Sequence, residues 1–239
     1  MKTFRIILIG LLVSFGSTGL QAQLLKNLGK MLSSEEKGLS AEDAAAGIRE
    51  ALTKGTENSV KLVSAVDGYF GNPKIKIPFP PEAEQIEQKL RAIGLGYKVD
   101  EAILTMNRAA EHAAKDIQPI FVNAIKKMTI SDAIGIVNGD VHAATEYLHR
   151  TTFDQLFQQI KPIVQNSLEA VDATKYWDDI INTYNTIPFV KKMNPDLAEY
   201  VTQKAIDGLF VMVAQEEEKI RKDPVARTTE LLQKVFGNN

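Results

Sequence analysis

Polar side chains with helical spacing lie near the middle of the chain, at Asn107, Arg108 and Glu111. On a helix, residues three and four positions apart are neighbours, so Arg108 can pair with Glu111 and Asn107 can hydrogen-bond to it. Two interpretations remain open. The three residues form a structural hydrogen-bonded group, or they form a buried network in which Arg108 binds a carboxylate or phosphate. All three are therefore candidates for ligand binding.

A second charged group, residues 215–221, directly follows an apolar helical stretch. Its simplest interpretation is a helix that emerges into water, and we expect this of Glu216. For Glu217 and Glu218 a second interpretation is equally open, in which a carboxylate stays partly buried beside Arg221 or Arg227 and lines a polar site. Glu217, Glu218 and Arg221 are thus the second set of ligand-binding candidates.

A possible metal site consists of His142, Glu146 and His149, which share one face of a helix. Imidazole and carboxylate groups at this spacing can bind a transition metal. A carboxylate-bridged di-iron site would need two Glu-x-x-His motifs, and the chain has only one. We therefore expect these residues to be surface polar groups, with no metal or other cofactor bound.

The composition excludes several classes of function. The chain has no cysteine, which excludes disulfides, zinc–thiolate sites, iron–sulfur clusters and thiol nucleophiles. A formal charge of −2 and a pI near 6.0 argue against nucleic-acid binding. The nucleophile elbow, the His-Glu-x-x-His motif and the phosphate-binding loop are all missing from the sequence. Carboxylates remain available as an acid or base, at Glu111, Asp132 and Glu218.

The first 22 residues have the pattern of a secretory signal peptide. Lys2 and Arg5 precede an apolar run that is too short to span a membrane stably, and small residues follow it. We expect cleavage after Ala22, a flexible or weakly helical leader over 23–39, and no transmembrane segment in the mature chain. Export without cysteines is typical of a periplasmic or secreted bacterial protein.

The remaining pattern predicts an all-α protein, a single compact bundle of about nine helices over residues 40–237. Ser40 and the Thr129–Asp132 pair are predicted helix caps. The predicted helices span 41–54, 56–66, 81–93, 101–128 with a kink at Pro119, 130–139, 141–150, 153–171, 174–185, 195–222 and 225–236. Between the second and third helices, residues 72–81 carry four prolines and form a predicted extended strap, with Ile75, Ile77 and Phe79 available to dock inward.

One segment, 208–214, is apolar on every side of its predicted helix. Such a helix must be surrounded by protein, because a surface helix needs a polar face. Gly208 suggests a close backbone approach there. The small side chains of 109–114 are the expected partner, and the helix that contains Ala143 and Ala144 is the alternative.

The chain resembles a family of exported bacterial helical proteins known only as a domain of unknown function, number four-one-nine-seven. The resemblance covers about 40–237 and is carried by the stretches 106–111, 128–133, 143–147, 200–202 and 208–210, and by Ala205, Ile220, Arg221, Pro224 and Arg227. It implies export and one helical domain, and it implies no reaction, ligand or partner.

Two functions follow as hypotheses. The first is a periplasmic binding or interaction protein whose apolar helices hold an amphiphile, a peptide or a protein partner; a fully packed bundle without a cavity would oppose its cleft version. The second is an envelope hydrolase that uses Glu111, Asp132 or Glu218 beside Arg108 or Arg221, with or without a metal. The sequence leaves the oligomeric state open.

Overall fold

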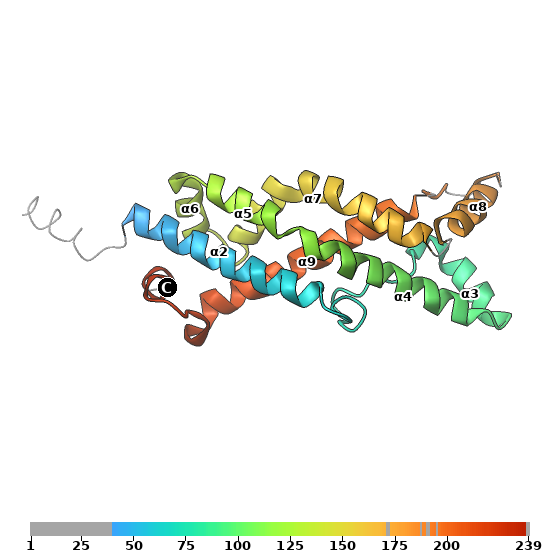
Figure 1. Cartoon of the computed structure of the whole chain (residues 1–239), viewed down its shortest axis with the longest axis horizontal. Helices are drawn as coiled ribbons and strands as arrows, with labels where there is room; N and C mark the ends of the chain where they lie inside the picture. Colours follow the sequence, from blue (N-terminus) through green and yellow to red (C-terminus); the bar gives the residue numbers. More distant parts are fainter. Residues whose placement is uncertain (1–39, 171–172, 187, 190–191, 195, 238–239) are drawn as a thin grey trace, which may run out of the picture. The chain divides into compact units, whose positions relative to one another are not determined.

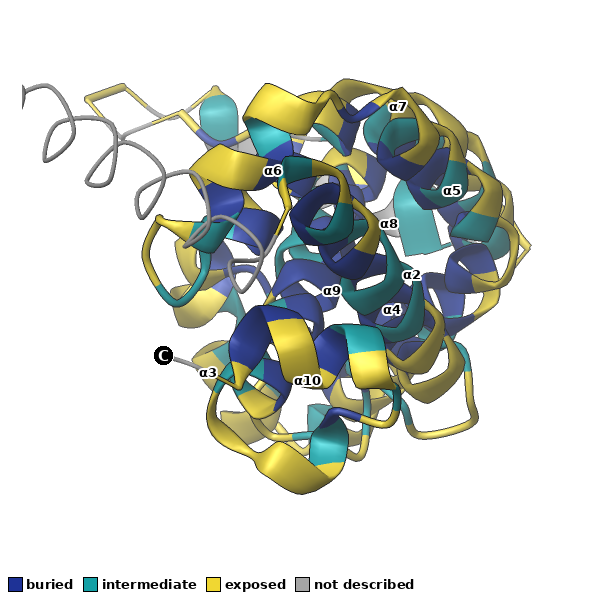
Figure 2. Ribbon diagram, turned by 90° about the vertical axis from the view of Figure 1, so that its left-hand side faces the viewer, coloured by how far each residue is buried: buried dark blue, intermediate teal, exposed yellow. Residues whose placement is uncertain are grey.

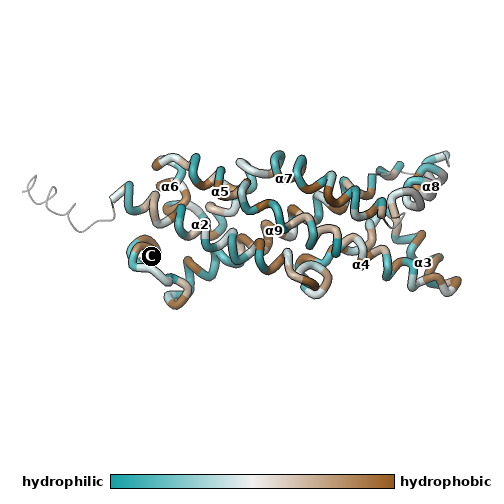
Figure 3. The backbone as a smooth tube through the Cα atoms, in the orientation of Figure 1, coloured by the Kyte–Doolittle hydropathy of each residue, from teal (hydrophilic) through white to brown (hydrophobic). Residues whose placement is uncertain are grey.

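The computed structural model describes residues 40–170, 173–186, 188–189, 192–194 and 196–237, so the expected signal peptide (1–22) and leader (23–39) lie outside the described residues. The described residues form α-helices and connecting turns, without a strand, so the all-α prediction is confirmed, with a helix count close to nine. The helices are α2 (Ala41–Val63), α3 (Glu84–Ala92), α4 (Gly96–Ala113), α5 (Gln118–Lys127), α6 (Ile130–Val137), α7 (Ala143–Glu169), α8 (Ala173–Asn185), α9 (Leu197–Lys222) and α10 (Glu230–Phe236), with short 3-10 turns η2 (Pro81–Ala83), η3 (Ala114–Asp116) and η4 (Pro224–Ala226) (Figure 1). Hydrophobic and hydrophilic positions alternate along these helices (Figure 3).

The first described helix, α2, begins where its cap predicts. The Ser40 hydroxyl accepts a hydrogen bond from the Asp43 amide at 3.0 Å. The predicted stop at Gly55 is wrong, because α2 continues through it to Val63. Thr56 does not cap a new helix; its hydroxyl donates to the Leu52 carbonyl at 2.8 Å and so fits inside the helix.

The two prolines within predicted helices have opposite effects. The prediction of a single kinked helix over 101–128 is wrong, because α4 ends at Ala113 and α5 begins at Gln118. Pro119 lies in the first turn of α5, where the missing backbone N–H would have no partner within the helix. Pro162, in contrast, lies inside α7, which joins the two helices predicted over 141–150 and 153–171. The threonine hydroxyls at this junction donate hydrogen bonds to carbonyls of the preceding turn. The Thr152 hydroxyl, for example, donates to the Leu148 carbonyl at 2.7 Å.

Helix α9 is packed against three long helices, α2, α4 and α7. Buried residues face the middle of the bundle in Figure 2. Within the apolar stretch, Leu209, Phe210 and Val213 are buried, and Phe210 meets Phe121 of α5 edge-on with ring centroids 5.9 Å apart. Val211 is 41% exposed and Ala214 is partly exposed, so the prediction that water reaches no part of this stretch is wrong at these two positions.

The close approach at Gly208 comes from the strap and the loop before it. A Cβ atom on Gly208 would lie 2.8 Å from Tyr69 Cε1 and 3.1 Å from Ile75 Cβ. The prediction of a partner in 109–114 or in the helix of Ala143 is therefore wrong for this contact. Ile75 and Ile77 of the strap are buried as expected, while Phe79 is only partly buried.

None of the helices in the described ranges is both long and apolar enough to cross a membrane.

Replacing Gly208 tests this packing. We expect Gly208→Ala to destabilise the fold by about 1–3 kcal/mol, because the added methyl group collides with two buried neighbours that cannot retreat. Urea unfolding measures the change. The matched control is Gly135→Ala in α6, where nothing beyond the adjacent residues and the backbone of its own helix lies within 4 Å of the new Cβ. There the helix propensity of alanine should stabilise the fold by about 0.5–1 kcal/mol. Equal effects at both positions would contradict the close approach.

Candidate functional site

The first predicted polar group lies on α4 and fastens the strap. Asn107 is fully buried, and its side-chain amide pairs with the backbone of Ile77 in both directions. Its Oδ1 accepts from the Ile77 amide at 2.8 Å, and its Nδ2 donates to the Ile77 carbonyl at 2.8 Å. The Asn107 side chain thus satisfies the backbone N–H and C=O of Ile77, as a neighbouring β-strand would in a sheet.

Glu111 holds the loop before the strap. One of its oxygens, Oε1, accepts hydrogen bonds from the amides of Tyr69 and Phe70, each at 3.1 Å. The other, Oε2, accepts from Arg108 at 2.6 Å, and Arg108 also pairs with Asp67 at 2.7 Å. Both oxygens of this buried carboxylate are therefore occupied by the protein itself.

Tyr69 completes this group. Its hydroxyl donates to the Ala205 carbonyl on α9 at 2.6 Å. Burial raises the pKa of Tyr69, and the charges of Glu111 and Asp207 raise it further, so the phenol stays protonated as a donor. Arg108 and Glu111 thus form one hydrogen-bonded group with the loop, as predicted. Asn107 bonds to Ile77 and Ile103 instead, so the predicted hydrogen bond between Asn107 and Glu111 is not formed.

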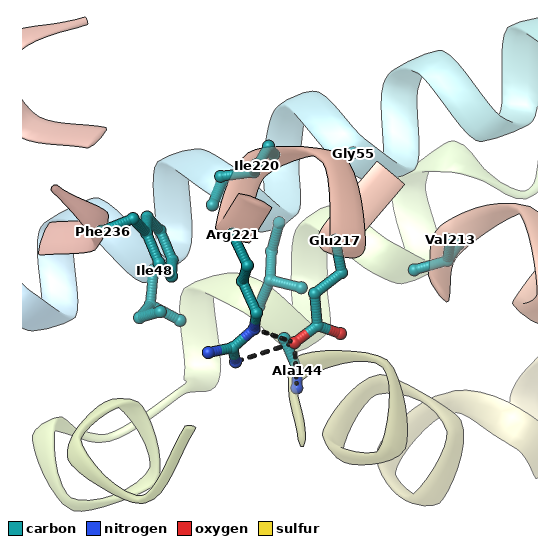
Figure 4. Close-up of a pocket in the computed structure, with 10 residues that line it drawn as sticks. Ile48, Gly55, Ala144, Val213, Glu217, Ile220, Arg221 and Phe236 are labelled. Carbon is teal, nitrogen blue, oxygen red and sulfur yellow. Dashed lines mark hydrogen bonds and ion pairs between the residues drawn. The ribbon is translucent and has the colours of Figure 1, made fainter. Parts of the chain in front are cut away.

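The second predicted group contains a carboxylate that caps another helix. Glu217 of α9 accepts from the Ala144 amide at 3.0 Å (Figure 4). It also accepts from the Thr145 amide at 2.8 Å and from the Thr145 hydroxyl at 2.7 Å. These amides belong to the first turn of α7, where backbone donors lack partners within the helix. His142, at the cap position, makes no side-chain cap bond. A residue 72 positions away from Thr145 thus takes over the capping role.

Arg221 balances the charge of Glu217 and extends the contact. It binds Glu217 Oε1 through Nε at 2.9 Å and through a terminal nitrogen at 2.8 Å, and it donates to the Ile136 carbonyl in α6 at 3.0 Å. Side-chain exposure is 11% for Arg221 and 7% for Glu217. The cavity beside this pair encloses about 20 Å³, room for about one water molecule.

The neighbouring glutamates differ from our expectation. Glu216 was expected in water but is only 7% exposed, and it accepts from Asn58 of α2 at 3.0 Å and pairs with Lys219. Glu218, a predicted binding residue, lies at the surface with Lys222, whose hydrogen bond lowers the pKa of Glu218. Glu218 therefore does not join Glu217 and Arg221.

The three residues considered as a weak metal-site candidate, His142, Glu146 and His149, do not form a metal-binding group. Glu146 and His149 are exposed, and the His149 ring packs against Phe153 and Phe210 at centroid distances of 5.1 and 4.8 Å. Across the described residues, no group of three metal-binding side chains is close enough to hold an ion.

A larger pocket lies elsewhere, lined by residues of α8, of the start of α9 with the segment before it, and of η2 with the end of the strap. Its volume is about 320 Å³, within the roughly 300–1,000 Å³ typical of ligand pockets. Its lining residues come from three parts of the chain: Pro80 and Glu82; Trp177; and Lys192, Met193, Asn194, Asp196, Glu199, Tyr200 and Gln203.

Hydrogen bonds and an ion pair fix several of the residues that line this pocket. Met193 pairs with the Asn185 side chain in both directions, through Met193 N to Oδ1 and through Nδ2 to the Met193 carbonyl, each at 2.8 Å. Asp196 caps α9 by accepting from the Glu199 amide at 2.8 Å and binds Lys161 at 2.6 Å. Burial alone would raise the pKa of Asp196, but these hydrogen bonds outweigh it and lower the pKa.

Two aromatic residues line the pocket. The Tyr200 hydroxyl donates to the Pro78 carbonyl at 3.2 Å, and burial together with the charge of Glu82 raises the pKa of Tyr200 to about 12. Trp177 is 7% exposed and meets Phe79 edge-on at 5.6 Å. The Trp177 Nε1–H is buried and has no acceptor within the described ranges; an N–H left without a partner costs about 1–3 kcal/mol.

None of the residues that line this pocket was among the ligand-binding residues predicted from the sequence. One available signal was the spacing of Asp196, Glu199, Tyr200 and Gln203, which places all four on one face of α9. The contributions of Glu82 and Trp177 depend on how distant segments fold together, and local spacing does not predict them.

A family model described as "Protein of unknown function (DUF4197)" matches residues 38–237, the family that the sequence motifs indicate. No curated protein and no solved structure matches the chain.

Replacing Glu217 tests its capping role. We expect Glu217→Gln to destabilise the fold by about 2–4 kcal/mol, because the buried Arg221 loses its counter-charge and the α7 amides lose a charged acceptor. The adjacent Glu218→Gln, at the surface, should change stability by less than about 0.5 kcal/mol. Both are measured by urea unfolding. A Glu217→Gln protein as stable as the Glu218→Gln control would refute the cap.

Proposed function

Since the chain belongs to the DUF4197 family, whose description names no activity, we propose from the geometry that it is a binding protein for a small amphiphilic ligand. The ligand occupies the pocket between α8, the start of α9 and the strap. Binding without chemical conversion requires a cavity, an apolar wall and a few polar groups that orient the ligand.

The observation that carries this proposal is the pocket itself. It combines a volume of about 320 Å³ with two aromatic side chains, Trp177 and Tyr200, and with charged residues around them. The cavity beside Glu217 and Arg221 is much smaller, at about 20 Å³. The pocket therefore has the dimensions and mixed chemistry that a small amphiphile needs.

The hydrolase alternative gains no support from the carboxylates on which it depended. Both oxygens of Glu111 accept hydrogen bonds from loop amides and Arg108. Asp132 is used in the capping box of α6, and the hydrogen bonds from Thr129 lower the pKa of Asp132. Glu218 is paired with Lys222 at the surface. A carboxylate already committed to structural donors is poorly suited to exchange protons with a substrate.

We place this binding in the bacterial periplasm or outside the cell. The support is the N-terminal sequence, in which a basic start, a short apolar run and small residues precede Gln23.

The single tryptophan of the chain provides the test, because Trp177 lies in the pocket wall. The probes are four compounds that share a phenyl ring: 2-phenylethylamine, phenylalanine methyl ester, 2-phenylethanol and 3-phenylpropionate. We expect at least one of them to change the emission of Trp177 saturably when only the indole is excited.

A pocket-filling variant makes the test specific. Asn194→Phe places a bulky ring at the exposed rim of the pocket and should weaken probe binding by about tenfold or more. The control is Gln155→Phe, the same kind of change at an exposed position of α7 outside the pocket, which should bind as the unchanged chain does. Failure of all four probes to bind, or an equal response of both variants, would overturn the proposed function.

A further inference from the structure

We infer that the ligand of this pocket carries a positively charged amine next to a hydrogen-bond acceptor. This inference rests on the proposed function and narrows it to cationic amphiphiles. It follows from the charges that line the pocket, from the arrangement of its aromatic walls and from one buried donor.

The charges that line the pocket favour a cation. Three carboxylates, those of Glu82, Asp196 and Glu199, face one ammonium group, that of Lys192. Lys161 pairs with Asp196 at 2.6 Å and forms a second, longer ion pair with Glu199 at 3.9 Å. In the part of the chain that the structure describes, neither Glu82 nor Lys192 forms an ion pair. Among the described residues, Glu82 forms no ion pair and Glu199 forms only the 3.9 Å one, so these two carboxylates can receive a positively charged group.

The aromatic side chains suit the same ligand. Rings of tryptophan and tyrosine attract cations at their faces and also bury apolar groups. Trp177 is held by its edge-on contact with Phe79, and Tyr200 by its bond to the Pro78 carbonyl. Together with Met193 they form an apolar wall close to the two available carboxylates. An amine attached to an apolar body matches this combination.

The unpartnered indole N–H supplies the second requirement. Trp177 is one of the lining residues, and its Nε1–H has no acceptor among the residues that the structure describes. An indole nitrogen can only donate, so the missing partner must be an acceptor such as a carbonyl, ester or hydroxyl oxygen. A ligand that carries this oxygen beside its amine would satisfy both features of the site.

The four phenyl probes separate the possibilities, because they share one apolar body and differ in the head group. The two amines should bind about tenfold or more tightly than 3-phenylpropionate, since opposite charges attract and like charges repel. Phenylalanine methyl ester, which has an acceptor, should bind about fivefold more tightly than 2-phenylethylamine, which has none.

Variants assign these preferences to residues. Glu82→Gln and Glu199→Gln should each weaken amine binding by about fivefold and leave 2-phenylethanol unchanged. Glu146→Gln, which removes the same charge at an exposed site on α7, is the control and should change neither. With Trp177→Phe, read by calorimetry, the ester should lose its advantage over the amine.

The outcomes distinguish the two proposals. Saturable binding with no preference for amines, or a preference that survives both glutamate variants, would overturn the inference and leave the binding function standing. An ester advantage that persists in Trp177→Phe would overturn the acceptor requirement. Absence of binding by every probe would overturn the binding function and the inference with it.

Discussion

The fold depends on a simple constraint: a backbone N–H removed from water needs an acceptor, and two buried glutamates provide it across long stretches of sequence. Glu217 serves the first turn of α7, and Glu111 serves the loop amides of Tyr69 and Phe70. Each carboxylate is balanced by an arginine on its own helix, at 2.8 Å for Arg221 and 2.6 Å for Arg108. An uncompensated charge at either place would be costly, so each glutamate and its arginine form one unit.

These two units hold separate elements of the bundle together. Glu217 and Arg221 join the start of α7 and the end of α6 to α9. Glu111 and Asn107 hold the loop and strap against α4, which in turn allows Tyr69 and Ile75 to reach Gly208. The residues that first suggested a binding site therefore stabilise the architecture.

Local rules predicted the parts of the fold that depend on neighbours in sequence. Ser40 and the Thr129–Asp132 pair cap their helices as expected, because a cap needs only residues within one turn. Gly55, Pro119 and Pro162 show the limit of these rules. The first and last of these residues lie within continuous helices, whereas Pro119 starts a new one, and sequence alone does not distinguish the three cases. The role of Glu217 depends on α7 and α9 lying side by side. The pocket depends on the meeting of η2, α8 and α9, so neither could follow from spacing.

The three-part construction of the pocket has a thermodynamic consequence. Its walls come from η2, from α8 and from the start of α9, with more than a hundred positions between Glu82 and Lys192, so only the assembled chain contains it. A molecule that binds there binds the native state alone, and by mass action it raises the free energy of unfolding by about 2.7 kcal/mol at a concentration a hundredfold above its dissociation constant. Resistance of the protein to heat would then rise with the amount of ligand around it.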